Sequence, residues 1–326
     1  MKKIFLFATA LLMSASMFAE GSVFTYTATE KLESQFAGLG TVVTHEFNEG
    51  NGTVTYSETV TEIKDATFYS CSSLTSITLP EGVTTIEGYA FNRCTALQSA
   101  TIPASVTTIG ECAFYGCESL QSIDLSNVTT IGESGFLSCS SLQSVDLSKV
   151  TSIEAQVFYM CSALQSVTIP AGVTTIGNYA FCDCSDLKSV TIPAGVTTIG
   201  NDAFSGCSAL QSITLPASVI TLGEEVFMGS GLTSVTIPAG VTTIGEAAFA
   251  DCTGLTSVTF LGNACQEGIG AYAFYDVGKK SPATLVLPAN WTGTKPNAQG
   301  KWYSGKFNLV IAPAKTSVIT YTAEEK

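Results

Sequence analysis

The chain has 326 residues, of which 45% are hydrophobic, and it carries 27 Asp and Glu against 14 Lys and Arg. Its net charge of −13 argues against binding to nucleic acids or anionic membrane surfaces, because both require a basic surface. The hydrophobic content is too high for a disordered chain. Glycine, serine and threonine interleaved with β-branched residues predict strands and turns rather than helices.

Residues 1–19 have the pattern of an export signal. Lys2 and Lys3 precede an apolar stretch that ends near Ala19, a small residue suited to cleavage. A retained membrane anchor is the alternative, although the stretch is short for a spanning helix. We expect a secreted or cell-surface protein, because no later stretch of the sequence is apolar for long enough to cross a bilayer.

Residues 20–56 differ in composition from the chain that follows and are expected to form an N-terminal cap. Two segments within them, VFTYTATEK and NGTVTYSETV, alternate in the manner of strands.

Residues 57–277 repeat a common pattern every 22 or 23 residues. The stretch VTIPAGVTTIG occurs three times, beginning at Val167, Val190 and Val235. One phenylalanine marks each unit: Phe68, Phe91, Phe114, Phe136, Phe158, Phe181, Phe204, Phe227 and Phe249, with Phe274 as a looser tenth. Units of this size cannot bury their own apolar faces and therefore stack into a solenoid.

Each unit predicts two short extended segments separated by fixed corners. Proline ends the first segment because it has no amide donor, and glycine is expected to permit a turn with positive φ. Phenylalanine then fills the centre of the core. The predicted fold class is a β-rich solenoid of about ten turns of 22–23 residues, with N- and C-terminal caps and little helix.

Residues 278–326 are expected to form the C-terminal cap and a tail, because an uncapped solenoid would expose apolar core. The segment LVLPANW predicts one last strand. Residues 318–326 match residues 23–31 at seven of nine positions. This match fits either an origin in tandem modules or a reading frame that stops early.

The repeated pattern LxxIxLPxxVxxIGxxAFxxC resembles that of the BspA-like leucine-rich-repeat surface proteins, from about Val60 to Tyr275. The resemblance implies a leucine-rich-repeat fold and a bacterial adhesin that binds host matrix proteins or other cells. Two units, Ser122–Gly132 and Ser144–Glu154, lack the proline, and Ser230 replaces a cysteine. Local bends are expected at these three departures.

Eight of the eleven cysteines share one column of the repeat: Cys71, Cys94, Cys117, Cys139, Cys161, Cys184, Cys207 and Cys252. Export invites a disulfide interpretation, but equivalent Cβ atoms of stacked turns lie about 4.8 Å apart, too far for that bond. We therefore predict buried, reduced thiols that act as small apolar fillers. Cys112, Cys182 and Cys265 lie outside the column and lack the spacing of a metal site.

The sequence contains no recognisable catalytic motif. The one histidine, His45, lies in the predicted N-terminal cap and is interpreted as a solvated side chain. Asp124 and Asp146 share a column in adjacent turns, where two carboxylates could hold a cation or transfer a proton. Solvated side chains are the favoured interpretation, because no further acidic column faces them. We predict a non-enzymatic protein with no cofactor and no metal.

Two surfaces are candidates for contact with a partner. The columns on either side of the Ala-Phe pair vary between turns, are expected to face solvent, and contain tyrosines, which favour binding. The predicted contact strip is formed by Tyr89, Tyr115, Tyr159 and Tyr179. The alternative is a hydroxyl-rich concave face that includes Ser144, Ser166, Ser189, Asp124 and Asp146.

These features predict a monomeric interaction protein that acts as an adhesin for host matrix proteins, cell-surface proteins or other cells. The alternative is an exported glycan-binding accessory or enzyme subunit. That function would use aromatic residues of the C-terminal cap: Trp291, Trp302 and Tyr303.

Overall fold

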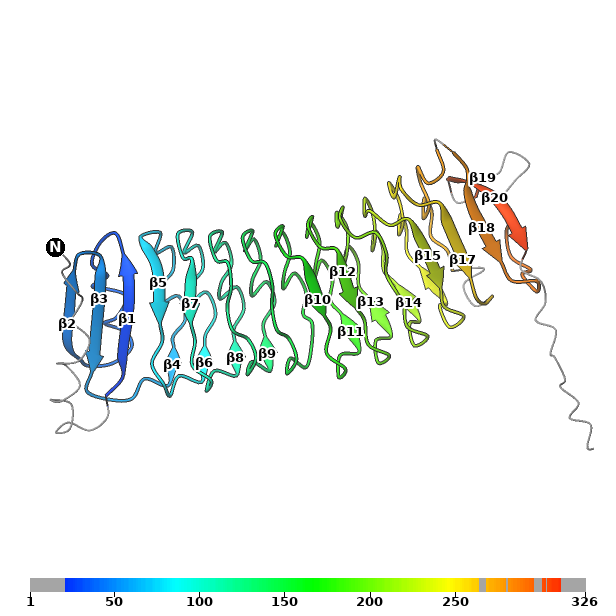
Figure 1. The fold of residues 1–326 in the computed structure, drawn as a ribbon. Helices are drawn as coiled ribbons and strands as arrows, with labels where there is room; N and C mark the ends of the chain where they lie inside the picture. The colour runs from blue at the N-terminus through cyan, green and yellow to red at the C-terminus, as the bar shows by residue number, and fades with distance from the viewer. Residues whose placement is uncertain (1–20, 264–267, 280, 296–300, 303, 312–326) are drawn as a thin grey trace, which may run out of the picture.

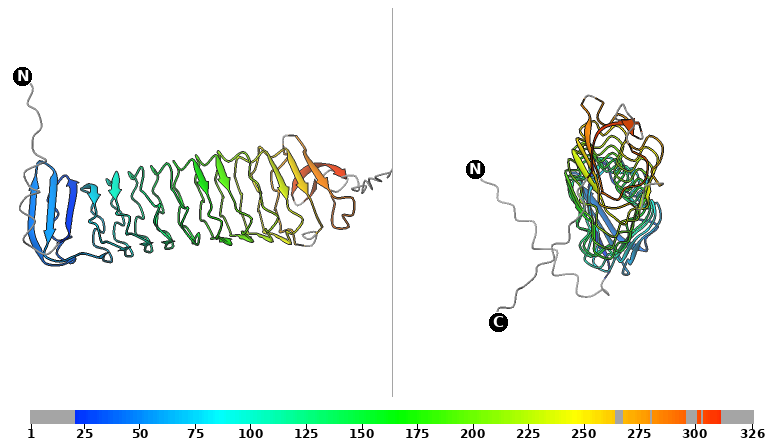
Figure 2. Two further views of the ribbon diagram at one scale, coloured as in Figure 1. Left: turned by 60° about the horizontal axis from the view of Figure 1, so that its bottom comes forward. Right: turned by 90° about the vertical axis from the view of Figure 1, so that its right-hand side faces the viewer.

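The computed structural model describes residues 21–263, 268–279, 281–295, 301–302 and 304–311. Within these residues the chain forms one elongated coil of stacked turns, without a helix, and this confirms the predicted solenoid (Figure 1). Viewed along the axis, the turns superimpose into one flattened coil (Figure 2). The predicted export signal, Cys265 and residues 318–326 lie outside the described residues.

One side of the coil, which we call the strand face, is built from the Ser-[Ile/Val]-Thr segments. Its strands are β5 (Leu74–Thr78), β7 (Ser99–Thr101), β10 (Ser166–Thr168), β12 (Ser189–Thr191), β15 (Ser234–Ile237) and β17 (Ser257–Phe260). Neighbouring strands pair in parallel and in register, so that Ser166 lies beside Ser189. Val167 is buried while Ser166 and Thr168 are exposed, as the period of two requires.

The strand face is interrupted at two places. The units that lack proline keep only an isolated bridge between Ser99 and Ser122, and Ser144 belongs to no strand. A second interruption lies between β12 and β15, in a unit that keeps its proline. Loss of the proline therefore accounts for only one of the two interruptions.

The second side of the coil consists of two-residue parallel strands from the Thr-Ile segments. They are β4 (Glu62–Ile63), β6 (Thr85–Ile86), β8 (Thr108–Ile109), β9 (Thr130–Ile131), β11 (Thr175–Ile176), β13 (Thr198–Ile199), β14 (Thr221–Leu222) and β16 (Thr243–Ile244). Pairing of β8 with β9, and of β14 with β16, continues across shortened units without a change of register.

The phenylalanines of the repeat form a continuous stack through the core. From Phe68 to Phe274, successive ring centroids lie 5.0–5.7 Å apart and the rings are within 20° of parallel. Each ring is fully buried. Such a pair contributes about 0.5–1.5 kcal/mol beyond the burial of apolar area.

The thiols of the cysteine column form hydrogen bonds with the backbone beside this stack. Seven of its thiols each donate a hydrogen bond, 3.0–3.2 Å long, to the carbonyl of the phenylalanine one turn earlier. The ten cysteines in the described residues are free thiols, and those of the column are buried. The prediction of unbonded thiols is confirmed, but they are hydrogen-bond donors as well as fillers.

The glycine that follows the Thr-Ile segment has a different role from the one predicted. Gly223, for example, has no positive φ, but a Cβ built on it would lie 2.5 Å from the backbone nitrogen of Asn201 in the preceding turn. Gly110, Gly132, Gly245 and Gly270 meet backbone nitrogens of the preceding turn at 2.4–2.6 Å in the same way. Close approach of successive turns, rather than a left-handed backbone, therefore requires this glycine.

The left-handed backbone lies instead at the residue before the Ala-Phe pair. None of its ten occupants is glycine, and φ lies between 51° and 58° at all of them: Ala66, Tyr89, Cys112, Ser134, Gln156, Tyr179, Asp202, Glu225, Ala247 and Tyr272. The amide of each of the first nine donates to a carbonyl of the next turn, as Tyr89 does to Glu111 at 2.9 Å. This third side of the coil is thus held by backbone hydrogen bonds without forming strands. We call it the tyrosine edge, and it includes this column and the column of residues directly after each phenylalanine.

The N-terminal cap is a three-stranded antiparallel sheet. Besides the two expected strands, β1 (Val23–Ala28) and β3 (Asn51–Tyr56), it contains β2 (Val42–Asn48) at its edge. Strand β1 also pairs antiparallel with β5, the first strand of the strand face. Phe36 covers the end of the phenylalanine stack, with its ring edge-on to Phe68 at 5.3 Å.

The C-terminal cap extends the strand face. Strand β18 (Ala283–Leu287), which contains the expected last strand, pairs parallel with β17, and β20 (Gly305–Ile311) pairs parallel with β18. The short β19 (Lys301–Trp302) lies antiparallel to β20. Phe307 meets Phe274 edge-on at 5.5 Å, so both caps end the stack in the same manner.

We predict that Gly223→Ala lowers the free energy of unfolding by about 1–3 kcal/mol, because its new methyl group collides with the turn before it. Gly172→Ala is the matched control, since a Cβ there meets nothing within 4 Å. Urea unfolding followed by circular dichroism measures both. Equal stability of the two variants would show that turn spacing does not restrict the glycine column.

We also predict a loss of stability between about pH 9 and pH 11 in reducing buffer. Burial raises the pKa of the Cys161 thiol to about 12 and that of Cys252 to about 11. A folded-state pKa above the unfolded one favours folding at lower pH, and this contribution is lost as the pH rises. For each buried thiol, the free energy of unfolding should fall by about 1.4 kcal/mol per pH unit between the unfolded-state pKa and the folded-state pKa.

Urea unfolding at several pH values measures this loss, and Cys161→Ser should reduce the slope by one thiol's share. Thiolate absorbance should rise only as the chain unfolds. If thiolate forms in the folded protein near the ordinary cysteine pKa, the buried ladder is wrong.

Candidate functional site

The strand face presents a uniform layer of hydroxyl groups. Ser144, Ser166 and Ser189 are exposed, as the sequence predicts. Ser144, Asp146 and Ser166 help to line a shallow hollow of about 260 Å³ where a unit without proline meets one with proline. The strand face has no aromatic ring or arginine among these residues, and such side chains dominate tight interfaces.

Asp124 and Asp146 have a structural role that the sequence analysis did not foresee. Each carboxylate accepts a hydrogen bond of 2.9 Å from a backbone amide two residues on, Ser126 for Asp124 and Ser148 for Asp146. Ser126 and Ser148 occupy the column of the proline, which has no amide to satisfy. The aspartates therefore accompany the loss of proline, and the amide of Ser126 lowers the pKa of Asp124.

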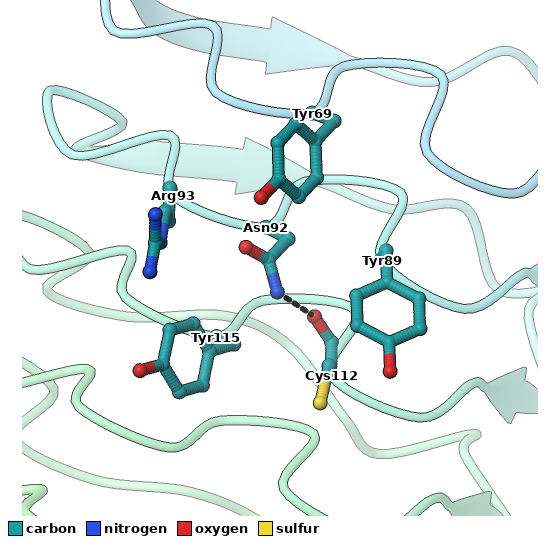
Figure 3. A pocket seen from close by; sticks show the side chains of 6 residues that line it. All are labelled: Tyr69, Tyr89, Asn92, Arg93, Cys112 and Tyr115. Atoms are coloured by element: carbon teal, nitrogen blue, oxygen red, sulfur yellow. Dashed lines mark hydrogen bonds between the residues drawn. The ribbon is translucent and has the colours of Figure 1, made fainter.

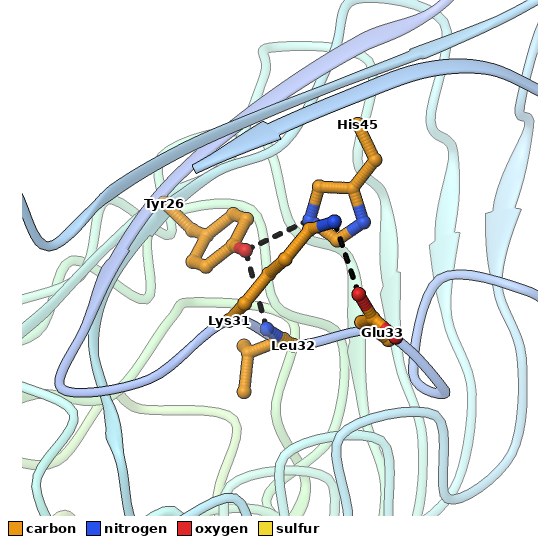
Figure 4. Close-up of polar contacts among 5 residues, drawn as sticks. All are labelled: Tyr26, Lys31, Leu32, Glu33 and His45. Atoms are coloured by element: carbon orange, nitrogen blue, oxygen red, sulfur yellow. Dashed lines mark hydrogen bonds and ion pairs between the residues drawn. The ribbon is translucent and has the colours of Figure 1, made fainter. Parts of the chain in front are cut away.

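His45 is not the solvated side chain that we expected. Its ring is half-buried, and its Nε2 lies 2.8 Å from the hydroxyl of Tyr26, which also accepts the amide of Leu32 (Figure 4). The ring meets Phe36 edge-on at 5.5 Å. Burial, with a smaller contribution from Lys31, lowers the pKa of His45. His45 is thus part of the aromatic packing of the N-terminal cap.

The four predicted contact tyrosines all lie on the tyrosine edge. Tyr89 and Tyr179 are each 38% exposed, and Tyr115 and Tyr159 are half-buried. The structure brings them together as two pairs rather than as one strip. Tyr159 and Tyr179 lie 6.1 Å apart between ring centroids, and Tyr89 and Tyr115 line a separate pocket.

The pocket beside Tyr89 has a volume of about 240 Å³. Tyr69, Asn92, Arg93 and Cys112 complete its lining (Figure 3). Tyr89 is fixed by donating its hydroxyl to the carboxylate of Glu111 at 3.0 Å, which raises the pKa of Tyr89 to about 12. Sequence reasoning missed Tyr69 and Arg93, although Tyr69 directly follows Phe68 and Arg93 is the one arginine of the chain.

The expectation that both variable columns face solvent is partly wrong. In the column after phenylalanine, Asn92, Leu137, Cys182 and Ala250 are buried. This column lies against the edge of the core, and Tyr69 and Tyr275 are its exposed members. In the column before the Ala-Phe pair, Ser134 is buried as well.

The C-terminal cap does not present Trp291 as an exposed ring. Trp291 is 4% exposed, packs against Phe260 at 5.4 Å, and donates its Nε1–H to the carbonyl of Thr294. Tyr303 and the side chain of Trp302 lie outside the described residues. Trp291 therefore cannot serve as a sugar-stacking platform in this conformation, contrary to the glycan-binding alternative.

Neither a metal site nor a membrane span is evident in the described part of the chain. No three His, Cys, Asp or Glu side chains there are grouped closely enough to hold a metal ion. The same residues include no helix with the length and apolar character needed to cross a bilayer.

The chain belongs to the BspA-type leucine-rich-repeat family. The family model described as "BspA type Leucine rich repeat region (6 copies)" matches residues 61–188 and 174–297. This match agrees with the repeat spacing, the stacked phenylalanines and the parallel strands. No curated protein matches the chain.

Several solved bacterial structures are similar to this chain. A leucine-rich repeat protein from Eubacterium ventriosum is 32% identical with a TM-score of 0.45, over 54% of this chain and 45% of that one. A leucine rich cell surface protein from Faecalibacterium prausnitzii is 25% identical with a TM-score of 0.44, over 84% and 86%. The chain thus spans less than half of the Eubacterium protein, and these TM-scores do not bear on function.

We predict that Asp124→Ala lowers the free energy of unfolding by about 0.5–1 kcal/mol, because the amide of Ser126 loses its acceptor at an exposed site. Asp124→Asn keeps the acceptor oxygen but loses the charge, so its stability should lie between those of the wild type and the Ala variant. The lowered pKa of Asp124 means that its contribution is present above about pH 4 and is lost on acidification.

Thermal unfolding of the three proteins at about pH 7 and pH 3 separates these effects. The wild type should approach the Asn variant at the lower pH, because a protonated carboxyl, like the amide, keeps a neutral acceptor oxygen. Both should stay more stable than the Ala variant. If Asn destabilises as much as Ala, Asp124 acts through its charge rather than through this hydrogen bond.

Proposed function

We propose that the chain is an exported, non-catalytic interaction protein that binds a protein partner through its tyrosine edge and acts as an adhesin. The observation that carries this proposal is the gathering of tyrosines on one side of the solenoid. Seven of the chain's eleven tyrosines lie there: Tyr69, Tyr89, Tyr115, Tyr159, Tyr179, Tyr272 and Tyr275.

The backbone at this edge makes the tyrosines costly to keep. Tyr89, Tyr179 and Tyr272 have φ of 54–56°, a left-handed conformation that disfavours bulky side chains by about 1–2 kcal/mol relative to glycine. Glycine would remove this cost. Each turn has a second left-handed position, two residues after the phenylalanine, and three turns have glycine there: Gly116, Gly206 and Gly229. The same conformation recurs in all ten turns with unlike side chains, so this cost is common to the column, and the chemistry of the tyrosines supports the proposed contact.

Tyrosine also suits the proposed contact chemically. It supplies a large rigid area and a polar tip at small entropic cost, which explains its enrichment in binding surfaces. Tyr272 and Tyr275 form a third exposed pair, 6.3 Å apart. Three clusters along one edge would let several modest contacts act together.

The remaining parts of the proposal have separate support. Residues 1–19 resemble an export signal, which supports an exported protein. The role of His45 in cap packing supports a non-catalytic function, because it is the chain's one histidine. Caps on both ends of the phenylalanine stack favour a monomer. The proposed partner is a host matrix or cell-surface protein.

The test replaces Tyr89, Tyr115, Tyr159 and Tyr179 together by serine and measures adhesion of mature protein to matrix proteins and intact cells. Binding should fall at least tenfold, because aromatic anchors contribute about 1–2 kcal/mol or more each. The matched control changes Ser144, Ser166 and Ser189 to glutamate on the strand face. Both variants should melt at the wild-type temperature, because none of these side chains belongs to the buried core.

Undiminished binding by the tyrosine variant, together with loss in the glutamate variant, would assign recognition to the strand face instead. Loss in both variants with unchanged melting would show that the partner covers two sides of the coil. That result would contradict a contact confined to the tyrosine edge.

A further inference from the structure

The pocket beside Tyr89 is shaped to receive one side chain. Its floor is Asn92, which is 5% exposed and donates its Nδ2–H to the carbonyl of Cys112. Tyr69 and Tyr115 occupy the same column one turn before and one turn after, so their backbones lie about 10 Å apart. The short Asn92 between two rings leaves a slot, with Tyr89 at one end and Arg93 at the other (Figure 3).

Arg93, an exposed side chain at one end of this slot, has no partner of its own among the described residues. Among the described residues, its guanidinium makes no hydrogen bond or ion pair, although the chain has 27 acidic residues. Its backbone is fixed, because the amide of Arg93 donates a hydrogen bond of 2.7 Å to the carbonyl of Tyr115. In the described part of the chain, no ion pair joins Arg93 to Glu111, whose carboxylate accepts the hydroxyl of Tyr89.

The lining selects the charge of the occupant. A cationic side chain would be attracted by tyrosine rings but repelled by the guanidinium, whereas a carboxylate can accept two parallel hydrogen bonds from it. The hydroxyls of Tyr69 and Tyr115 point toward the Arg93 side of the slot (Figure 3). The ring faces remain for an aliphatic stem.

We propose that this pocket, the Arg93 slot, receives an aspartate or glutamate side chain from an extended segment of the partner protein. The inference rests on the proposed function, since the slot lies on the same tyrosine edge. It adds the chemistry of the partner: an acidic residue is the anchor, its carboxylate held by Arg93 and its methylene groups held between Tyr69 and Tyr115.

The direct test uses a minimal probe, N-acetyl-glutamate-N-methylamide, titrated into mature protein with ring-labelled tyrosines and followed by NMR. A single side chain should bind only in the millimolar range. Resonances of Tyr69, Tyr89 and Tyr115 should shift, while Tyr159 and Tyr179 serve as an internal control without an arginine. The corresponding glutamine compound should bind at least tenfold more weakly.

Arg93→Gln should abolish the shifts, and Arg93→Lys should restore them in part, because lysine keeps the charge but not the paired donors. Lys188→Gln is the matched control, since it changes the net charge equally at an exposed position on the strand face. Sodium glucuronate tests the other source of a carboxylate. Tighter binding of glucuronate than of the glutamate compound would overturn the assignment to a protein segment.

Absence of shifts, or shifts that survive Arg93→Gln, would also overturn the proposal. Adhesion assays separate this failure from failure of the proposed function. If the four-tyrosine variant loses adhesion while Arg93→Gln retains it fully, the tyrosine edge is the contact and the Arg93 slot is not its anchor. If the tyrosine variant retains adhesion, the proposed function fails whatever the probe does.

Discussion

The structure depends on the stacking of each turn on the next at about one strand spacing. The phenylalanine stack shows this constraint most clearly, because its ring centroids stay 5.0–5.7 Å apart over ten turns. Parallel strands on two sides and backbone hydrogen bonds on the tyrosine edge keep the same spacing. No turn could bury its apolar side chains without the turns before and after it.

This spacing explains why most columns of the repeat are chemically fixed. Backbones that approach so closely leave no room for a Cβ at Gly223 or Gly245. The thiol column places a small donor against a buried carbonyl beside the phenylalanine stack. Cys161 donates in this way to Phe136, whose carbonyl also accepts the amide of Cys139. Where serine replaces the proline, as at Ser126, its backbone amide needs an acceptor. The carboxylate of Asp124 provides that acceptor.

The same constraint concentrates specificity where stacking does not dictate the side chain. A coil built from nearly identical units offers repeated hydroxyls on its strand face, and repetition provides little to distinguish one partner from another. The tyrosine edge differs, because its left-handed positions accept unlike side chains and its clusters are unequal. Arg93 occurs in one cluster only, which makes that turn chemically unique within the coil.

Each cap meets the repeats by the same physical means, with an aromatic ring edge-on to the last ring of the stack. Phe36 does this at the first turn and Phe307 at the last. An edge-to-face ring ends a run of parallel rings favourably, because its positive edge meets the negative face. Each cap also covers the edge of the last repeat strand, since β1 pairs with β5 at one end and β18 pairs with β17 at the other.

The sequence by itself determined the solenoid, its period, its buried phenylalanines and its free thiols, because each follows from a periodic pattern and local chemistry. Only the tertiary structure decided how columns of adjacent turns meet. The left-handed backbone lies at positions such as Tyr89 rather than at the glycine. His45 packs within the N-terminal cap, and Asn92 is buried between Tyr69 and Tyr115. These features join residues that are distant in sequence, such as Tyr26 and His45 in the cap or Tyr69 and Asn92 in adjacent turns, and their distance and orientation depend on the tertiary fold.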